Sequence, residues 1–294
     1  MTQVKEVDPL LSILIVNYNG KQFLGPCFDS IKKHLSLPYE IIVVDNASVD
    51  DSANFIQNKY PEVRLIRSEL NRGFAAGNNL AAEVARGEYF LILNNDTLLL
   101  CDIKNAMAQL EADRTIGALG IKVLGREGEK RCSAGYFPTP WRTMRLASLF
   151  NKRVMKTEGQ SCHSVDWIEG SFILTRRELW KKLNGMDQGY FMYVEDIDYC
   201  KRLKDAGFRS VYFPAASVVH YGGYADARLS MLIKSYRRYH KKFYSPLKGF
   251  IANGLLSLSL MLKVIFYALS SVLCGGEGIL RVKARLKALI ESPW

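Results

Sequence analysis

Three carboxylates crowd into four residues of the stretch EDIDYCKRL, which starts with Glu195 and Asp196 and continues to Asp198. Carboxylates this close raise one another's pKa, which helps one of them to remove a proton at neutral pH. The stretch also predicts a helix closing at Gly207, and the positive end of a helix favours the ionised form. The pattern fits a general base, and it fits equally the charged first turn of an ordinary helix.

A second polar cluster interrupts the apolar run EYFLILNNDTLLL at residues 88–100. The apolar part predicts a buried strand, which ends at Asn94, Asn95 and Asp96. A turn is the simplest explanation, because Asn and Asp side chains bond to the local backbone and stop a strand. A lone histidine, His220, ends the apolar stretch SVYFPAASVVH, where a structural role is more common than metal binding.

The elements that would position these residues alternate between strand-like and helix-like stretches. In chain order they are LLSILIVNYNG, KQFLGPCFDSIKKHL, YEIIVVDNAS, DDSANFIQNKY, VRLIRSE, GFAAGNNLAAEVARG and EYFLILNND. This order predicts an α/β fold with a doubly wound, mostly parallel sheet and right-handed crossovers. Ligands bind outside the carboxyl ends of such strands, where NYNG, DNAS and NND all fall. Three polar clusters should therefore share one edge of the sheet.

Motifs typical of other nucleotide-binding enzymes are absent from the sequence. The first strand-to-helix turn, NYNGKQFLG, lacks the G-x-G-x-x-G of a dehydrogenase, and the chain has no P-loop. A sugar-phosphate nucleotidyltransferase would carry a Gly-rich loop with an Arg after its first strand, and this chain does not.

Length and composition fit one large α/β domain with an appendage, or two small domains, since the chain has 294 residues and 48% are hydrophobic. The 40 Lys and Arg against 29 Asp and Glu give a net charge of +11, which suits nucleic acid, an anionic membrane or an anionic substrate. The six cysteines form no C-x-x-C pair and no secretory signal precedes the first strand. We therefore expect reduced thiols in a cytosolic compartment.

The second half of the chain is less regular. Residues 115–165 are expected to be irregular and to form an excursion over the site. After them, WIEGSFILTR predicts a strand, RRELWKKL a short helix, and SVYFPAASVVH a pair of strands ending at His220.

Seven motifs follow one another in the order SILIVNYNG, VVDNAS, NRGFAAGNN, LNND, EGSF, YVEDIDYCKRL and VVH. In these motifs the chain resembles family 2 glycosyltransferases with the GT-A fold, and most closely their bacterial rhamnosyltransferase-type branch. The resemblance covers roughly residues 10–225. It implies a GT-A catalytic domain over 1–225, with a donor-binding half at about 1–115 and an acceptor and base half at about 116–225.

The resemblance also implies where a nucleotide-sugar donor would bind. Asp45 in VVDNAS takes the place of the acid that reads the nucleobase, and a carboxylate can accept the imide N–H of uracil or thymine. Asp45 or Ser48 could instead cap a helix over VDDSANFIQ. Arg72 would make charge-assisted hydrogen bonds to the diphosphate. The implied donor-binding set is Asn17, Asn19, Asp45, Asn71, Arg72, Gly73, Asn78, Asn95 and Asp96.

The NND stretch resembles the family's Asp-x-Asp element, with Asp96 as the remaining carboxylate and Asn94 in place of the first. His220 matches the histidine that completes the metal site in many members. A nucleotide diphosphate binds a divalent cation through its oxygens, and mixed carboxylate and histidine ligation suits Mg²⁺ or Mn²⁺. Asp96 and His220 are the expected metal ligands.

Asp196 matches the family's catalytic base. Direct displacement at the anomeric carbon, with inversion, needs a base on the face opposite the leaving nucleotide, and it needs no covalent intermediate. Glu195 would orient the acceptor, and Asp198 would cap the helix or position Arg202. The EGSF stretch would form the floor beneath donor and acceptor. Its acceptor-binding residues are expected to be Glu169, Gly170 and Ser171.

Residues 226–294 are predicted to form a basic, amphipathic, helical extension that associates with the membrane. Seven Lys or Arg against one Asp lie between Asp226 and Lys248, without a nucleic-acid recognition motif. From there to Glu277 the only charge is Lys263, over a length that can cross a bilayer. At 100° per residue the polar residues share an arc of about 160°, which favours a helix in the membrane interface, or a hairpin-like dip into the membrane, over a clean transmembrane span. The polar residues are Asn253, Ser257, Ser259, Lys263, Tyr267, Ser270 and Ser271. A helix packed on the catalytic domain, or in a dimer interface, is the alternative.

Together these features predict an inverting, metal-dependent hexosyltransferase at the cytoplasmic face of the cell membrane, attached peripherally or as a monotopic protein. The resemblance suggests a dTDP- or UDP-sugar donor, with dTDP-L-rhamnose first. The suggested acceptor is a polyprenyl-diphosphate-linked saccharide in cell-wall or surface polysaccharide synthesis. Nucleic acid is not an expected partner. The alternatives are a non-catalytic, membrane-bound nucleotide-sugar binding protein and a soluble sugar-phosphate nucleotidyltransferase.

Overall fold

The computed structural model of the chain describes residues 8–146, 162–222, 228–274 and 277–292. The chain forms two compact units. The first contains Met1–Tyr136, Val154–Gly189 and Glu195–Gly222, and the second contains Phe137–Arg153, Tyr190–Val194 and Gly223–Trp294. The predicted excursion over the site falls partly on residues 147–161, which lie outside the described residues.

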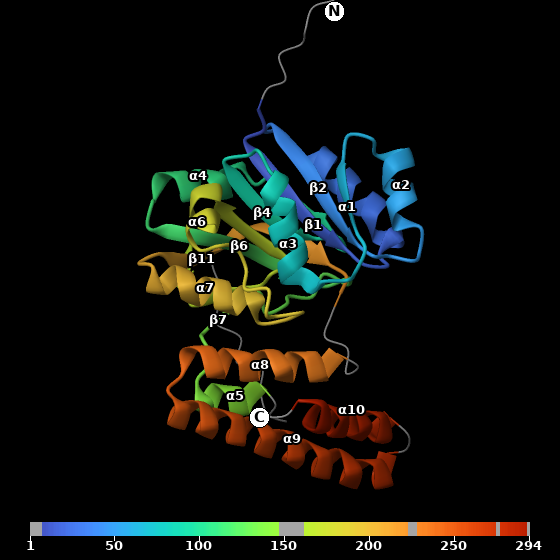
Figure 1. Ribbon diagram of the computed structural model, residues 1–294, viewed down its shortest axis with the longest axis vertical. Helices are drawn as coiled ribbons and strands as arrows, with labels where there is room; N and C mark the ends of the chain where they lie inside the picture. The colour runs from blue at the N-terminus through green and yellow to red at the C-terminus, as the bar shows by residue number, and fades with distance from the viewer. Residues whose placement is uncertain (1–7, 147–161, 223–227, 275–276, 293–294) are drawn as a thin grey trace, which may run out of the picture. The chain divides into compact units, whose positions relative to one another are not determined.

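The first unit is built on a nine-stranded sheet with the strand order β3-β2-β1-β4-β10-β6-β11-β5, and with β8 paired to β11 (Figure 1). Strands β3, β2, β1 and β4 are parallel to one another, as are β6 and β11, whereas β10 runs antiparallel to β4 and β6. The sheet strands are β1 (Leu11–Asn17), β2 (Tyr39–Asn46), β3 (Arg64–Ser68), β4 (Tyr89–Asn94), β5 (Thr97–Leu99), β6 (Ile116–Leu124), β8 (His163–Val165), β10 (Phe172–Arg176) and β11 (Arg209–His220). The predicted mostly parallel α/β sheet is confirmed.

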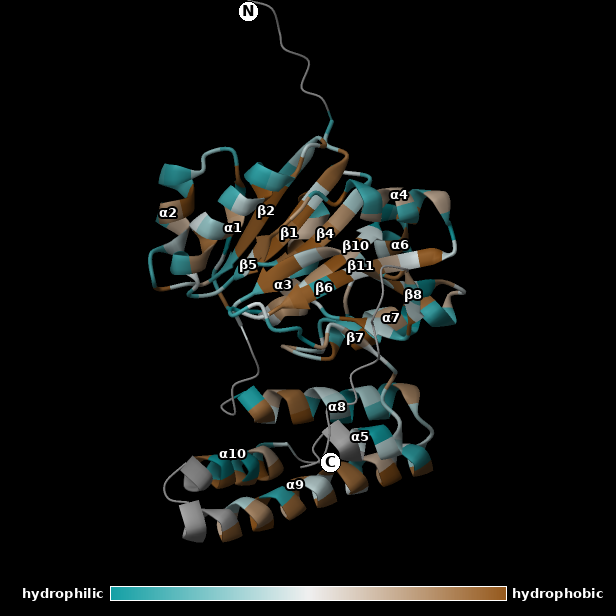
Figure 2. Ribbon diagram, turned by 180° about the vertical axis from the view of Figure 1, so that it is seen from behind, coloured by the Kyte–Doolittle hydropathy of each residue, from teal (hydrophilic) through white to brown (hydrophobic). Residues whose placement is uncertain are grey.

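Helices cover both faces of this sheet, as the continuous apolar strands require. On one face, Leu11, Ile13 and Ile15 of β1 join a buried cluster with residues of α1, α2 and α4. On the other face, Phe90 of β4 contacts Trp180 of α6. Figure 2 shows the central strands as apolar bands between more polar helices. The helices are α1 (Lys21–His34), α2 (Ser52–Lys59), α3 (Gly73–Val84), α4 (Lys104–Ala112), α6 (Arg177–Lys182) and α7 (Glu195–Asp205).

The parallel register brings the ends of distant strands to one edge. Asn17 at the end of β1 pairs with Asp45 of β2, and its neighbour Val16 pairs with Asn94 of β4. On the far side of the sheet, His220 at the end of β11 pairs with Thr97, which follows the NND turn directly. The edge formed by the carboxyl ends of these strands is called the catalytic edge below.

Three local predictions need correction. Residues 116–124, expected to be irregular, form the nine-residue central strand β6. The expected strand WIEGSFILTR is broken at residues 169–171 into β10 and the short β9 (Trp167–Ile168), which pairs with β7 (Ala134–Gly135). The expected pair of strands ending at His220 is one strand, β11, with a register shift between Phe213 and Ser217.

The second unit contains the helices α5 (Pro140–Leu146), α8 (Leu229–Phe243), α9 (Pro246–Cys274) and α10 (Glu277–Glu291). In α9, polar residues face the unit's interior: the Asn253 side chain lies 2.8 Å from Nδ1 of His240, and Ser257 Oγ accepts a 3.0 Å hydrogen bond from Arg237. Apart from Lys248, the exposed side chains of α9 are apolar. Figure 2 colours much of this helix as hydrophobic. The exposed apolar side chains include Phe250, Leu258, Met261, Leu262, Ile265 and Leu269. By length and composition alone, Pro246–Leu269 is the one helix in the described chain that could cross a membrane.

Arg176 provides a test of how the first unit holds together. Its side chain is 3% exposed, and its guanidinium donates hydrogen bonds to the carbonyls of Leu110, Arg114 and Ile116. It therefore ties the end of β10 to the connection between α4 and β6. We expect Arg176→Leu to lower the free energy of unfolding by about 3 kcal/mol or more, because three carbonyls lose their donor. Urea denaturation measures the change; a loss below about 1 kcal/mol would contradict this account of the contact.

Candidate active site

Asn17 joins the loops that follow β1, β2 and β4. Its amide nitrogen donates to Oδ1 of Asp45 at 2.9 Å and to Oγ of Ser48 at 3.1 Å, while its amide oxygen accepts from Asn95 at 2.7 Å. Asn19 continues this arrangement: its backbone N–H donates to Ser48 at 2.9 Å. These predicted donor-binding residues come together at the catalytic edge. Asn17 itself is fully buried and holds its neighbours in place.

Asp45 braces this edge and does not cap α2. One of its carboxylate oxygens accepts from Asn17 and the other accepts from the backbone N–H of Ser48 at 3.2 Å. The helix begins only at Ser52, whose backbone N–H is taken by Asp50 at 3.1 Å. The capping alternative is therefore wrong. Tyr18, which we did not single out from the sequence, is 53% exposed beside this loop and offers a flat ring to a ligand.

The predicted segment around Arg72 starts α3. Asn71 accepts the backbone N–H of Gly73 at 3.0 Å, and the Gly73 carbonyl accepts from Asn46 at 3.0 Å. The Arg72 side chain is exposed and available to an anion. Asn78 is fully buried, and its amide nitrogen donates to the Phe74 carbonyl at 3.0 Å within the same helix.

His220 lies between two carboxylates. Its Nε2 is 3.3 Å from Oδ1 of Asp96 and 3.1 Å from the Asn94 amide nitrogen, while its Nδ1 is 3.1 Å from Oε1 of Glu169. Burial lowers the pKa of His220, but hydrogen bonds and charge from Asp96 and Glu169 outweigh it and raise the pKa to about 9. The structure thus joins the two predicted metal ligands. It also places Glu169, predicted as an acceptor-binding residue, against the histidine ring.

These residues fit a divalent cation. A carboxylate oxygen and a histidine nitrogen face each other, and a second carboxylate on Nδ1 fixes the ring as it does in many metal sites. Gly222 leaves room beside them, since a Cβ there would lie 2.5 Å from Oδ2 of Asp96 and 3.1 Å from Nε2 of His220. Within the described ranges, no cluster of three or more His, Cys, Asp or Glu side chains is arranged to hold a metal. A diphosphate and water would therefore have to supply the other ligands.

Asp196 lies next to the EGSF stretch. Its Oδ2 accepts the backbone N–H of Gly170 at 2.9 Å, and its Oδ1 accepts that of Ile197 at 2.8 Å. Desolvation raises the pKa of Asp196 to about 6, against the hydrogen bonds, which lower it. Burial and the charge of Asp196 raise the pKa of Glu195, which is 5% exposed, well above its usual range.

The third acid of the cluster belongs to the scaffold. Asp198 is fully buried, and one of its oxygens lies 2.5 Å from Nε of Arg202. The same guanidinium donates to the carbonyls of Leu183 and Gly185 at 2.7 and 2.8 Å. Of its two predicted roles, capping the helix or positioning Arg202, the structure supports the second.

Glu169, Gly170 and Ser171 connect the histidine to the base. The Glu169 carboxylate contacts His220, the Gly170 N–H contacts Asp196, and the Ser171 carbonyl accepts the Asn94 N–H at 3.2 Å. Ser171 is 2% exposed, and its Oγ has no hydrogen-bond partner among the described residues. The strand break at residues 169–171 therefore places backbone and side-chain groups between the expected metal and the expected base.

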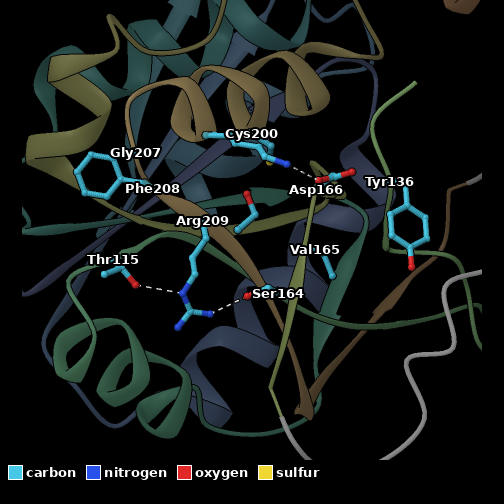
Figure 3. Close-up of a pocket in the computed structure, with 11 residues that line it drawn as sticks. Thr115, Tyr136, Ser164, Val165, Asp166, Cys200, Gly207, Phe208 and Arg209 are labelled. Carbon is cyan, nitrogen blue, oxygen red and sulfur yellow. Dashed lines mark hydrogen bonds and ion pairs between the residues drawn. The ribbon is translucent and has the colours of Figure 1, made fainter. Parts of the chain in front are cut away.

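A cavity of about 390 Å³ lies at the opposite end of β11 (Figure 3). Its basic residues are already paired, because Lys204 lies 3.0 Å from Asp166, and Arg209 contacts Asp113, Thr115 and Ser164. It is separated from the catalytic edge by the length of that strand.

The chain is similar in sequence to known glycosyltransferases. The family model described as Glycosyl transferase family 2 matches residues 12–183. An N-acetylglucosaminyl-diphospho-decaprenol L-rhamnosyltransferase of Mycobacterium tuberculosis is 26% identical, over 74% of this chain and 78% of its own length. The rhamnosyltransferase WbbL of Escherichia coli K12 is 29% identical, over 80% of this chain and 91% of its own.

Solved structures share the fold at lower identity. A mannosyltransferase of Pyrobaculum calidifontis, in complex with GDP-Man and Mn²⁺, superposes with a TM-score of 0.59 at 17% identity. The match covers 97% of this chain and 86% of that one. GalNAc-T7 with UDP, GalNAc and Mn²⁺ superposes with a TM-score of 0.60 at 18% identity, over 81% of this chain and 48% of its own. These structures support the GT-A fold.

The contact between Glu169 and His220 leads to a prediction about metal binding. We expect Glu169→Gln to weaken Mn²⁺ binding by about tenfold or more when a nucleoside diphosphate is present. The negative charge of Glu169 orients the His220 ring and makes Nε2 a better metal ligand, and the substitution removes this charge. Electron paramagnetic resonance of free Mn²⁺ gives the affinity without any turnover. Glu83→Gln, at an exposed position of α3, is the matched control. Equal affinities in the two variants would return Glu169 to an acceptor-binding role.

Proposed function

Because this chain belongs to glycosyl transferase family 2, and is therefore a hexosyltransferase using a nucleotide-sugar donor, we propose that its reaction takes place at the catalytic edge with Asp196 as base. The observation that carries the proposal is the bridge formed by residues 169–171. One end of this bridge contacts His220, beside Asp96, and the other end holds the carboxylate of Asp196. A leaving diphosphate and an attacking hydroxyl need these two sites close together and distinct.

Each residue has a separate part in the displacement. Asp45 and the exposed ring of Tyr18 would bind the nucleobase, and Arg72 the diphosphate. Asp96 and His220 would hold a divalent cation, which stabilises the negative charge that develops on the leaving diphosphate. Asp196 would accept the proton of the acceptor hydroxyl as that oxygen attacks the anomeric carbon from the opposite face, which inverts the configuration. The Gly170 N–H keeps the Asp196 carboxylate oriented.

The sugar and the acceptor are proposed from relatives. Two of them are named as rhamnosyltransferases, and the name of one gives an N-acetylglucosaminyl-diphospho-decaprenol acceptor. We therefore propose L-rhamnose from dTDP-L-rhamnose as the transferred sugar and a polyprenyl-diphosphate-linked saccharide as the acceptor. A lipid-linked acceptor requires the enzyme to work at a membrane surface, where nucleotide sugars reach it from the cytoplasm.

The second unit supports this location. Between residues 228 and 292 the chain has 12 Lys or Arg and two Glu, a net charge of +10 out of the +11 of the whole chain. The exposed apolar side chains of α9 belong to the same unit. A unit that combines exposed apolar side chains with an excess of positive charge matches the interface of an anionic bilayer.

A donor panel tests the proposed function. Nucleoside diphosphate release would be measured with dTDP-L-rhamnose, other dTDP-sugars and UDP-sugars, with membrane lipid extract as acceptor and with Mg²⁺, Mn²⁺ or a chelator. Acceptor-dependent release from dTDP-L-rhamnose that the chelator abolishes is the expected result. Release of inorganic diphosphate from a nucleoside triphosphate would indicate a nucleotidyltransferase. Binding of donors without release would indicate a non-catalytic nucleotide-sugar binding protein.

The pKa of Asp196 leads to a prediction about pH. Because only the ionised carboxylate accepts a proton, we expect kcat to rise with pH through about 6 and to be lost below it. Asp196→Asn keeps the shape of the side chain but accepts no proton, so kcat should fall by about 10² or more while donor affinity stays within a few-fold. Turnover of the Asn variant near the wild-type rate would remove Asp196 from the mechanism.

The apolar face of α9 leads to a prediction about membrane binding. Leu258, Leu262 and Leu269 lie on one stripe of the helix and are 47, 52 and 65% exposed. At about 1.5 kcal/mol for each side chain withdrawn from water, the triple change to Gln should weaken partitioning into anionic vesicles by about 10³. Val49→Gln, at a side chain that is 90% exposed on the first unit, should leave partitioning unchanged. Equal sedimentation of both variants with vesicles would contradict the membrane role of α9.

A further inference from the structure

The five residues before α7 contain two adjacent backbone outliers. Tyr193 and Val194 have φ angles of 72° and 70°, in the left-handed region. A side chain branched at Cβ is rarely found there, and such a conformation persists only where the surroundings impose it. The segment Tyr190–Val194 is called the strap below.

The strap is anchored within the second unit. Ser235 of α8 donates a 2.9 Å hydrogen bond to the Met192 carbonyl. The Arg238 guanidinium lies 5.2 Å from the centre of the Tyr190 ring. Tyr190 and Val194 are only 1 and 3% exposed. The two contacts from α8 hold the strap on the N-terminal side of Tyr193, and the burial of Val194 restrains its other side.

The chain passes from the strap directly into the residues that do the chemistry. Val194 is followed by Glu195 and Asp196, the first two residues of α7. The backbone at Val194 therefore sets the direction in which α7 starts and the place of the Asp196 carboxylate. A catalytic group displaced by about 1 Å can cost about a hundredfold in rate. The rate that would be lost by displacing the base can therefore outweigh the backbone strain at Tyr193 and Val194.

We propose that the strap positions the catalytic base: Ser235 and the packing around Val194 hold the backbone left-handed, and this conformation aims Asp196 at the acceptor hydroxyl. The inference rests on the proposed function for the role of Asp196 as base. It makes Val194 and Ser235 positioning residues that do not touch the substrate. Both residues belong to the unit that carries α9.

Two substitutions at Val194 separate a positioning role from a purely structural one. Val194→Ala removes most of the buried side chain but keeps a Cβ, so the left-handed backbone stays strained. Val194→Gly removes the Cβ as well, and Gly adopts a positive φ without strain. The Gly variant should therefore melt at a higher temperature than the Ala variant. It should also turn over about tenfold more slowly, because a Gly backbone no longer fixes the start of α7.

The kinetic readout is the division of this loss between kcat and KM. We expect the loss in kcat alone, with the donor KM unchanged, because none of the proposed donor-binding residues belongs to the strap. Asn184→Gly is the matched control: Asn184 is exposed, has a φ of 55° and lies outside the proposed site. It should leave kcat unchanged. The proposal would be overturned if Val194→Gly turned over as fast as Val194→Ala. It would also be overturned if kcat rose and fell with melting temperature among the three variants.

Hydrogen exchange gives a readout that does not depend on turnover. The amides of residues 195–197 should exchange faster in Val194→Gly and in Ser235→Ala than in the wild type, since the first turn of α7 loses its restraint. Unchanged exchange in both variants would overturn the proposal. If the wild type transferred no sugar, the proposed function would fail, and the exchange rates would still decide whether the strap restrains α7.

Discussion

The buried amide of Asn17 is the contact on which the catalytic edge depends. Both of its N–H bonds and its oxygen are used, toward Asp45, Ser48 and Asn95. These partners lie 28, 31 and 78 residues away along the chain, so each loop after β1, β2 and β4 takes its place relative to the others through one side chain. Only a parallel register that puts Asn17 opposite Asp45 allows this. A buried amide whose donors and acceptor are all hydrogen-bonded has little uncompensated desolvation cost, and its bonds fix the positions of its three partners.

The parts of the first unit that the sequence predicted well are those with strong local signals. The strands β1, β2 and β4 are long apolar runs, and the polar residues that end them could be assigned to one edge from the strand order alone. Strand β6 was missed because Gly117 and Gly120 weaken its pattern. Both glycines are explained by packing: a Cβ at position 117 would lie 2.6 Å from the Leu203 side chain, and one at 120 would lie 2.8 Å from that of Ile168. Neighbours supplied by distant parts of the chain made small residues necessary, and a single sequence does not reveal them.

The candidate site divides in the same way. Asp96, His220 and Asp196 were predicted from motifs that resemble those of a known family. The structure places Asp96 against His220. The contact between Glu169 and His220 spans 51 residues and joins a strand break to the end of a strand, so no spacing rule predicts it. The same holds for the strap, because a left-handed Val is imposed by its surroundings and leaves no trace in composition. Residues that act by positioning other residues are therefore the ones that are hardest to predict from the sequence.

Helix α9 shows what the hydrophobic periodicity of a helix predicts and what it leaves open. The sequence separates a polar arc from an apolar one, but the period alone does not tell which arc faces the protein. In the structure the polar arc faces inward at Asn253 and Ser257, where it meets His240 and Arg237, and the apolar arc is exposed. For α9 to cross a bilayer by itself, these hydrogen bonds would have to break and their partners would be left without them, at a cost of about 1 to 3 kcal/mol for each buried polar group. For α9 to lie in the interface, every contact within the unit can stay, and the exposed apolar side chains leave water. The internal hydrogen bonds of the helical unit therefore favour the arrangement in the plane of the membrane over the span.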